Sequence, residues 1–441
     1  MAKAKSKKIM LEDALVPVDE QPYQIPENWC WTRIKHVSDV VTGSTPSKKH
    51  AEYYGGDFPF FKPADLEAGD NVVEATEYLS EEGKNVSRII PKLSTAVCCI
   101  GSIGKTGLIR VEGTTNQQIN SMIPKINPLY LYYYSKSNVF IEELWNKSTA
   151  TTISLVNKKN METNTIPLAP LAEQKRIVEQ IESLFSKLDE AKEKVQEVID
   201  GYEARNAAVY NDAFSGRLTA QWRKDNYKEN KWETKRFDEV ADIKSNLVEP
   251  SNYLEFPHIA PDNIEKRTGI LLDYHTIAED GVKSGKHRFY AGQILYSKIR
   301  PYLSKVVMVD FDGLCSADMY PIEAKENTKY LLYYMLSDMF LEQASSAGSR
   351  SVLPKINQKE LSAIKVRITS DEEQKEVVRI LDYLLPMMQQ VRDKAVQVVD
   401  NIDTIKKSIL AKAFRGKLGT NIPEDESAME LLKIILNKGE C

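Results

Sequence analysis

The sequence predicts an α+β protein in which two globular domains alternate with two long repeated helices. Residues 169–218 carry apolar side chains at alternating spacings of four and three, the pattern of a coiled-coil seam. Residues 370–418 repeat this pattern without a gap, 200 positions later. Strand and turn patterns fill the region before each helix. We therefore predict a duplicated unit, a domain followed by a helix, whose two helices form a long antiparallel coiled coil between the domains, with internal pseudo-twofold symmetry.

The two helical stretches share more than their apolar spacing. Glu173-Gln174-Lys175 recurs as Glu373-Gln374-Lys375. Gly216 suits the C′ position that ends a helix, whereas Pro386 is expected to kink the second helix because it removes a backbone hydrogen bond. The predicted seam consists of Ile177, Ile181, Leu184, Leu188, Ala191, Val195, Val198 and Tyr202 in the first helix, and of Val377, Leu381, Leu384, Met388, Val391, Ala395, Val398 and Ile402 in the second.

The order of these patterns along the chain predicts the bounds of the remaining segments. Asn127 and Pro128 suit the N-cap and the first position of a helix late in the first domain, and Asn327 stands at the matching place in the second. The predicted segments are an N-terminal tail (1–25), a first domain (26–168), a first helix (169–218), a linker (219–231), a second domain (232–369), a second helix (370–418) and a C-terminal tail with a short helix (419–441).

Connectivity also decides how the helices pair. The second domain follows the C-terminal end of the first helix, and the second helix starts from that domain. If the two seams pair, the helices must therefore run antiparallel. The resulting pseudo-twofold axis matches the symmetry of duplex DNA and suits two short half-sites separated by an unread stretch.

The amino-acid composition is typical of an ordinary folded protein. The 441 residues suffice for two or three domains, and 42% of them are hydrophobic and 28% charged. Five cysteines include no CxxC pair, which argues against a zinc site and against a disulfide framework. No apolar run reaches the length of a membrane span, and Glu12 and Asp13 interrupt the N-terminal apolar stretch that a signal peptide would need. We expect a cytoplasmic protein.

No catalytic constellation is evident. Gly104-Lys105-Thr106 resembles the end of a phosphate-binding loop, but Cys99 stands where that loop needs its first glycine, so a turn is expected. Asn127-Pro128-Leu129-Tyr130 approaches a motif of amino-methyltransferases, but leucine replaces its second proline and no glycine-rich cofactor loop precedes it. The five histidines form no metal-ligand spacing. The sequence thus predicts no enzyme, no bound metal and no bound cofactor.

DNA binding is the function that local patches favour. The net charge of −4 lacks the basic excess typical of DNA-binding proteins, so partners would carry part of the phosphate contact. Candidate contacts are polar and basic residues on predicted turns, where Asn and Gln suit adenine, Arg suits guanine and Lys suits the backbone. They are Ser44, Thr45, Lys48, Lys49, Lys62, Lys105, Asn116, Gln117, Gln118, Lys158 and Lys159 in the first domain, and Lys244, Asn246, His258, Asn263, Lys286, His287, Arg288, Lys298, Arg300, Tyr302 and Arg350 in the second.

A cluster of tyrosines in the predicted helix after Asn127 offers a second way to meet DNA. Its rings could stack on bases, but at helical spacing such a cluster more often belongs to the core. The cluster comprises Tyr130, Tyr132, Tyr133 and Tyr134. We expect most of them to be buried.

The whole plan resembles the specificity subunit of a type I restriction-modification system. The resemblance covers residues 26–418 and is carried by the helix starts PLAEQKRIVEQIE and EEQKEVVRIL and the helix ends AFSGRL and AFRGKL. Within the domains it is carried by ILYSKIRPYL (294–303), TNQQIN (115–120) and CSADMYPI (315–322).

The resemblance implies a division of labour. Each domain would be a target recognition domain that reads one half of a bipartite DNA sequence, and the helices would dock two methyltransferase subunits. Those subunits would bind S-adenosylmethionine and methylate adenine, while restriction subunits would use ATP and Mg²⁺ to translocate and cut DNA. Two other classes compete: a self-sufficient nuclease or methyltransferase, which lacks its motifs here, and a coiled-coil scaffold that binds only proteins, which leaves the basic-aromatic turns unexplained.

Overall fold

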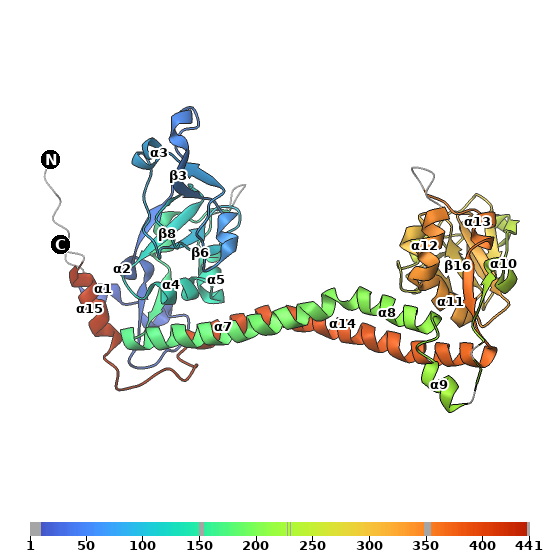
Figure 1. The fold of residues 1–441 in the computed structure, drawn as a ribbon. Helices are drawn as coiled ribbons and strands as arrows, with labels where there is room; N and C mark the ends of the chain where they lie inside the picture. The colour runs from blue at the N-terminus through green and yellow to red at the C-terminus, as the bar shows by residue number, and fades with distance from the viewer. Residues whose placement is uncertain (1–9, 150–153, 227, 230, 348–353, 439–441) are drawn as a thin grey trace. The chain divides into compact units, whose positions relative to one another are not determined.

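The computed structural model describes residues 10–149, 154–226, 228–229, 231–347 and 354–438 (Figure 1). The chain divides into two compact units. Unit 1 comprises Met1–Lys194 and Val398–Cys441, and unit 2 comprises Val195–Gln397. Each unit therefore holds one domain together with parts of both long helical stretches.

The domain of unit 1 is built on two small sheets. The first has four antiparallel strands in the order β2-β8-β5-β6, and the second joins β4, β3 and β7, with β3 parallel to β7. A separate antiparallel pair, β1 with β9, brings the beginning and end of the domain together. The strands are β1 (Cys30–Arg33), β2 (Ser38–Thr42), β3 (Tyr54–Phe61), β4 (Glu77–Leu79), β5 (Thr95–Cys98), β6 (Thr106–Leu108), β7 (Thr114–Thr115), β8 (Ile119–Pro124) and β9 (Thr165–Leu168).

Helices surround these sheets and join them to the termini. The side chain of Asn127 caps the helix that begins at Pro128, accepting from the backbone N–H groups of Leu129 and Tyr130, which confirms the predicted cap. α15 packs against α1 and α2 within the same unit (Figure 1). The helices are α1 (Leu11–Ala14), α2 (Ile34–Val37), α3 (Glu81–Asn85), α4 (Pro128–Ser135), α5 (Asn138–Asn146), α6 (Lys158–Glu162) and α15 (Ala428–Lys438).

The domain of unit 2 repeats this plan. The sheet β11-β19-β16-β17 matches β2-β8-β5-β6, and β14-β13-β18 matches β4-β3-β7 but is extended by β15 and β12 to five strands. The strands are β10 (Glu233–Arg236), β11 (Ala241–Ile243), β12 (Leu247–Val248), β13 (Pro257–Ile259), β14 (His275–Thr276), β15 (Lys286–Phe289), β16 (Ile294–Ser297), β17 (Val306–Met308), β18 (Gly313–Cys315), β19 (Met319–Ala324) and β20 (Lys365–Ile368).

The helices of unit 2 follow the same order. Asn327 caps the helix that begins at Thr328, as Asn127 does in unit 1, and α11 packs against β17 and β19. β10 pairs with β20, closing the second domain as β1 and β9 close the first. The helices are α9 (Ala220–Asp225), α10 (Phe237–Val240), α11 (Thr328–Leu336), α12 (Asp338–Ala347) and α13 (Gln358–Ser362).

The first long helical stretch consists of two helices. α7 (Leu171–Asp200) ends before Gly201 and α8 (Tyr202–Phe214) follows it, but backbone hydrogen bonds from Gly201 to Glu197 and from Arg205 to Gly201 continue the helical path, so the predicted long helix is present with an interruption at Gly201. Glycine has no Cβ and destabilises a helix interior, which explains a break at this residue. At the other end Gly216 has a left-handed φ of +81°, which confirms it as the residue that terminates the helix.

The second stretch is α14 (Asp371–Ala413), a helix of 43 residues that contains Pro386. Pro386 is exposed and does not end the helix. In unit 1, Asp189 of α7 accepts from the Nζ of Lys406 of α14 at 2.5 Å. In unit 2, the hydroxyl of Tyr202 of α8 donates to Gln389 of α14 at 2.5 Å. Higher numbers on the first stretch thus meet lower numbers on α14, which is the antiparallel direction.

The seam register differs from the predicted one beyond Leu188 and Met388. Up to those residues every predicted seam side chain is buried or half-buried. Beyond them Val195, Tyr202, Ala395 and Ile402 are also buried or half-buried, but Ala191, Val198, Val391 and Val398 are exposed. The residues at 192, 199, 392 and 399 are half-buried in their place. Two consecutive four-residue spacings, as in 184–188–192, shift a seam by one position, and this happens identically in both repeats.

Candidate nucleic-acid interface

The Glu-Gln pair at the start of each long helix is a junction between segments. In unit 1 the carboxylate of Glu173 is fully buried and accepts hydrogen bonds from Trp29 Nε1 at 2.7 Å, Asn421 Nδ2 at 2.9 Å and Thr420 Oγ1 at 3.4 Å. Trp29 opens the domain, whereas Thr420 and Asn421 follow α14. One side chain therefore joins the first domain, the start of α7 and the end of α14.

Unit 2 repeats the junction with different partners. Glu373 accepts from Trp232 Nε1 at 2.9 Å and from the hydroxyls of Thr219 at 2.5 Å and Thr369 at 2.7 Å. It also forms an ion pair with the nearly buried guanidinium of Arg223. Glu173, by contrast, has only uncharged donors among the described residues.

The neighbouring glutamines tie each helix start to its domain. Gln174 donates to the carbonyl of Ala169 at 2.8 Å and accepts from the backbone N–H of Asn127 at 3.0 Å. Gln374 makes the same bonds with Thr369 at 2.9 Å and Asn327 at 3.2 Å. The sequence contained a signal for these four residues, the repeated Glu-Gln-Lys tripeptide, but gave no sign of their partners.

The tyrosines of α4 belong to the core. All four are buried, and the hydroxyl of Tyr130 donates to the carbonyl of Pro167 at 2.6 Å. Burial raises the pKa of Tyr130 and Tyr134 well above its usual value. Phe414, from the end of α14, meets both rings edge-on. The structure therefore offers no stacking surface for bases at this cluster.

In the first domain the structure brings several candidate contacts together. The loop after β2 lies against the turn before β8: the backbone N–H of Ser44 donates to Thr115 at 2.9 Å, and Thr45 bonds to Gln117. Lys48 and Lys49 extend this loop into solvent, whereas Asn116 is buried and bonds to Gln118 at 3.0 Å. The surface formed by residues 44–49 and 117–118 is the candidate DNA-reading face of this domain.

Other candidates of the first domain are engaged elsewhere. Lys62 pairs with Glu77 at 2.8 Å and Lys105 with Glu67 at 2.6 Å, so carboxylates already neutralise both ammonium groups. Lys158 and Lys159 lie on α6, a helix rather than the expected turn, and Lys158 pairs with Glu162 at 3.5 Å.

In the second domain three of the predicted turn residues lie in a strand. Lys286, His287 and Arg288 are part of β15, and His258 is part of β13. Lys286, His287 and His258 are also buried, so the expectation of exposed turn residues is wrong for them. Basic residues gave the stretch a turn-like composition, but pairing with β12 and β18 makes it an inner strand of the five-stranded sheet.

Most remaining candidates of this domain have intramolecular partners. Each makes at least one side-chain bond: Lys244 to Glu323 at 2.8 Å, His258 to Asp280 at 2.7 Å, Asn263 to Asp273 at 2.7 Å and Lys298 to Ala317 at 2.5 Å. Asn246, Arg300 and Tyr302 are exposed. Arg350 lies outside the described residues.

Arg300 is held in an unusual backbone conformation. Its φ of +48° is left-handed, a region that costs a non-glycine residue roughly 1–2 kcal/mol, whereas repeat one has Gly101 with φ of +77° at the matching place. The match follows from equivalent bridges, Ile100 with Leu155 and Ile299 with Lys355. The exposed guanidinium of Arg300 is therefore presented at a strained turn that repeat one builds with glycine.

Comparisons with known proteins agree with this arrangement of two related domains. A model of the type I restriction modification DNA specificity domain matches residues 26–200 and 229–394, one stretch in each repeat. The chain belongs to this family. It is a DNA specificity subunit of a type I restriction-modification system, with two domains for a bipartite target, and the catalytic activities lie in other subunits.

Similar proteins cover the chain almost completely. The type I restriction enzyme EcoDI specificity subunit of Escherichia coli is 33% identical over 423 residues, which is 90% of each chain. The MjaIX specificity subunit of Methanocaldococcus jannaschii is 24% identical over 430 residues, 90% of this chain and 94% of that one. The crystal structure of the HsdS subunit from Thermoanaerobacter tengcongensis shares the fold with a TM-score of 0.63 at 17% identity, covering 91% and 100% of the two chains.

One long helix of this specificity subunit, α14, carries an exposed apolar stripe. On α14, Tyr383, Met387 and Val391 are 67%, 43% and 51% exposed and lie at four-residue spacing on one face. The matching positions of α7 hold Ser183, Lys187 and Ala191. Solvent-exposed apolar side chains in a row mark a surface that another protein can cover.

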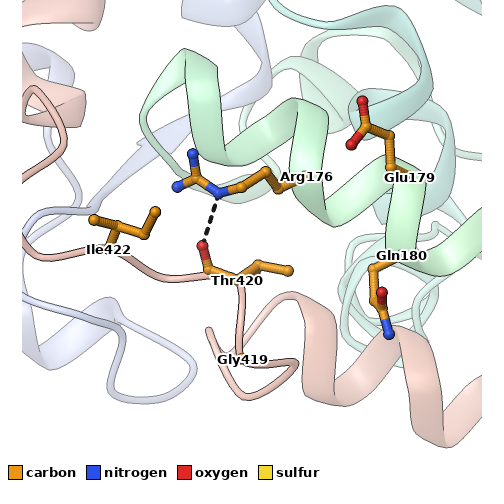
Figure 2. Close-up of a pocket in the computed structure, with 6 residues that line it drawn as sticks. All are labelled: Arg176, Glu179, Gln180, Gly419, Thr420 and Ile422. Atoms are coloured by element: carbon orange, nitrogen blue, oxygen red, sulfur yellow. Dashed lines mark hydrogen bonds between the residues drawn. The ribbon is translucent and has the colours of Figure 1, made fainter.

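A pocket of about 310 Å³ lies where α7 meets the segment after α14 (Figure 2). Arg176 lines it but already donates to the carbonyl of Thr420 at 3.0 Å and pairs with Asp425, so its charge is satisfied. Within the described residues no cluster of three or more His, Cys, Asp or Glu could hold a metal ion. Nor is any described helix both long and apolar enough to cross a bilayer.

Proposed function

We propose that residues 26–168 read one half of the bipartite DNA target and that residues 232–369 read the other. The observation that carries the proposal is a frame that the two repeats share, with turns that hold different residues. Asn116, Gln117 and Gln118 occupy the turn where the second repeat has 316–318, Ser-Ala-Asp, although the strands on either side match. Two domains that share a scaffold but hold different residues at the same turn suit two half-sites of different sequence.

We further propose that the paired helices dock two methyltransferase subunits, and that restriction and translocase subunits complete the assembly. The exposed stripe at Tyr383, Met387 and Val391 supports a protein contact on α14. S-adenosylmethionine, ATP and Mg²⁺ would be bound by those partners and not by this chain, whose sequence lacks a glycine-rich cofactor loop. The assembly would act in the cytoplasm, where its DNA is found.

The charge distribution supports shared DNA binding. The chain has a net charge of −4, and several lysines of the candidate faces already pair with carboxylates. Because phosphate contacts supply much of the affinity of DNA-binding proteins, methyltransferase subunits would contribute a large share of it. The isolated chain is then expected to bind DNA weakly.

The alternative function is a coiled-coil scaffold that binds only proteins. A selection experiment separates the two. The chain, assembled with its methyltransferase subunits, is incubated with a randomised DNA pool, and the retained sequences are read. Enrichment of two short elements at a fixed spacing supports the proposal. No enrichment, together with binding that does not weaken as salt rises, would leave the scaffold as the better account.

A further inference from the structure

Arg288 differs from Arg236 and Arg267 of the same domain in the partners of its guanidinium. Arg236 pairs with Asp238 at 2.7 Å, and Arg267 pairs with Asp338. Arg288 has no carboxylate partner in the described part of the chain; its Nη1 donates a long hydrogen bond of 3.5 Å to the hydroxyl of Tyr253, and its Nε is buried without a hydrogen-bond acceptor. A buried guanidinium N–H without an acceptor, in a cation without a carboxylate partner, is costly unless a ligand supplies one.

Three aromatic rings hold this guanidinium. Its central carbon lies 4.8 Å from the ring centre of Tyr290, 5.4 Å from that of Tyr253 and 5.9 Å from that of Phe256. Such cation–π contacts orient the flat group as well as attract it. Tyr290 is 43% exposed, so the aromatic cluster reaches solvent.

Strand pairing determines on which face of the sheet the side chain of Arg288 lies. His287 pairs with Cys315 and Phe289 with Gly313. Phe289 and Cys315 belong to the small core of this domain. Because successive side chains of a strand point to opposite faces, Arg288 lies on the face away from that core.

Repeat one has a different residue at this place. Phe289 opposes Gly313 in β18, and in repeat one Ile90 forms the corresponding bridge with Gly113. Ile89 therefore stands where Arg288 stands in repeat two, and it is 36% exposed. A position that is half-buried with Arg288 in one repeat and exposed with Ile89 in the other, and that differs in chemistry between them, has the character of a specificity determinant.

We propose that Arg288 reads a guanine in the half-site bound by residues 232–369, donating two hydrogen bonds to the O6 and N7 atoms of its major-groove edge. A guanidinium is the side-chain group that most often makes this bidentate contact. A phosphate contact needs only a positive charge, whereas a base edge needs a donor plane of fixed orientation, and the three rings supply that orientation. The inference rests on the proposed function, since it assumes that this domain reads DNA.

The test is the randomised-DNA selection with the complex of this chain and its methyltransferase subunits. Arg288→Met keeps an unbranched side chain among the three rings but removes the donors. We expect it to lose roughly 10- to 100-fold discrimination at one G·C position and to leave every other position unchanged. Arg288→Lys keeps the charge without the planar fork, and we expect a weaker preference for guanine at the same position.

Arg236→Met is the matched control, because that guanidinium is exposed and paired with Asp238 in the same domain. It should leave the selected sequence unchanged. Two results with Arg288→Met would overturn the proposal: an unchanged motif, or equal weakening on all sequences with a shallower salt dependence, which marks a phosphate contact. If the wild-type complex selects no two-part motif, the proposed function itself fails, an outcome visible before any variant is compared.

Discussion

Trp29 donates a hydrogen bond of 2.7 Å to Glu173, and Trp232 donates one of 2.9 Å to Glu373. The first residue of each pair opens a domain and the second opens a long helix, so the two repeats use the same bond to fix a domain on its helix. The other hydrogen-bond partners of the two glutamates differ in charge. Glu373 faces the cation of Arg223, whereas Glu173 has uncharged donors among the described residues.

This difference predicts that a Glu→Gln substitution lowers the free energy of unfolding by different amounts at the two junctions. Glu373→Gln leaves the guanidinium of Arg223 nearly buried without its anion, which should lower the free energy of unfolding by about 3–5 kcal/mol. Glu173→Gln removes the negative charge of an acceptor whose donors among the described residues are all uncharged. It should lower the free energy of unfolding by about 1–2 kcal/mol. Urea denaturation measures both. Glu179→Gln, on the exposed face of α7, should stay within about 0.5 kcal/mol of wild type; equal costs for the two junction variants would contradict the assignment of Arg223.

His36 should make stability depend on pH. Burial, aided by Lys35, Arg33 and Lys125, lowers the pKa of His36 from 6.5 to about 4. As pH falls, the imidazole of His36 therefore becomes protonated in the unfolded chain before it does in the folded protein. The contribution of neutral His36 to folding stability is complete above pH 6.5 and is lost as pH falls toward 4. We expect the wild type to lose on the order of 1–2 kcal/mol more than His36→Leu over this range.

Urea denaturation at several pH values checks this expectation. The exposed His50 provides the control, because His50→Gln should keep the slope of the wild type. An identical pH dependence for wild type and His36→Leu would mean that His36 does not remain neutral in the folded protein.

The stripe on α14 predicts a partner contact. Met387→Glu with Val391→Glu places two charges on an exposed apolar face, so the isolated chain should keep its stability while its affinity for methyltransferase subunits falls at least tenfold. Sedimentation velocity with purified subunits measures the assembly. Val396→Glu places a charge on an exposed apolar residue on the opposite side of α14, at about 100° per residue, and should assemble like wild type; undiminished assembly of the double variant would exclude the stripe as a docking surface.

Exchange of residues 26–168 for the first domain of another specificity subunit should alter one half of the recognised sequence. The β1–β9 pair closes this domain at its two ends, so the exchange keeps the junction with α7. Selection from randomised DNA identifies both halves. A change in both halves would contradict the assignment of one domain to each half-site.

Helix length is expected to set the unread gap between the half-sites. Removal of seven residues, one heptad, from α7 and of the matching seven from α14 keeps the paired faces in register. The selected motif should then keep both half-sites and change only its spacing. An altered half-site with an unchanged gap would show that the helices do not act as the spacer.

The sequence predicted the features that depend on local patterns. The duplication, the cap at Asn127 and the terminating Gly216 all follow from residue types at fixed positions, and the structure has them. Beyond Leu188 the predicted seam is wrong at Ala191 and Val198, which are apolar and continue the heptad spacing but are exposed, whereas Val195 and Tyr202 are half-buried. Only packing reveals that Lys192 and Ile199 take their places.

The candidate DNA contacts were harder to predict, because composition does not distinguish a basic turn from a basic strand. Lys286 and His287 are buried in β15, and two of the three rings around their neighbour Arg288, Tyr253 and Phe256, lie more than 30 residues away in the sequence. Most partners of Glu173 and Glu373 were equally hard to predict, since the tryptophans open the domains and Thr420, Asn421, Thr219 and Arg223 follow the opposite helix in the chain. Long-range pairing of this kind leaves no periodic trace in a single sequence.

Single-molecule sequencing of adenine methylation tests the central claim most directly. Cells that express this chain together with its methyltransferase subunit are compared with cells that lack only this chain. The account predicts a methylated motif of two short elements with a fixed gap, present only when the chain is expressed. The same methylation pattern with and without the chain would contradict its role as the subunit that supplies DNA specificity.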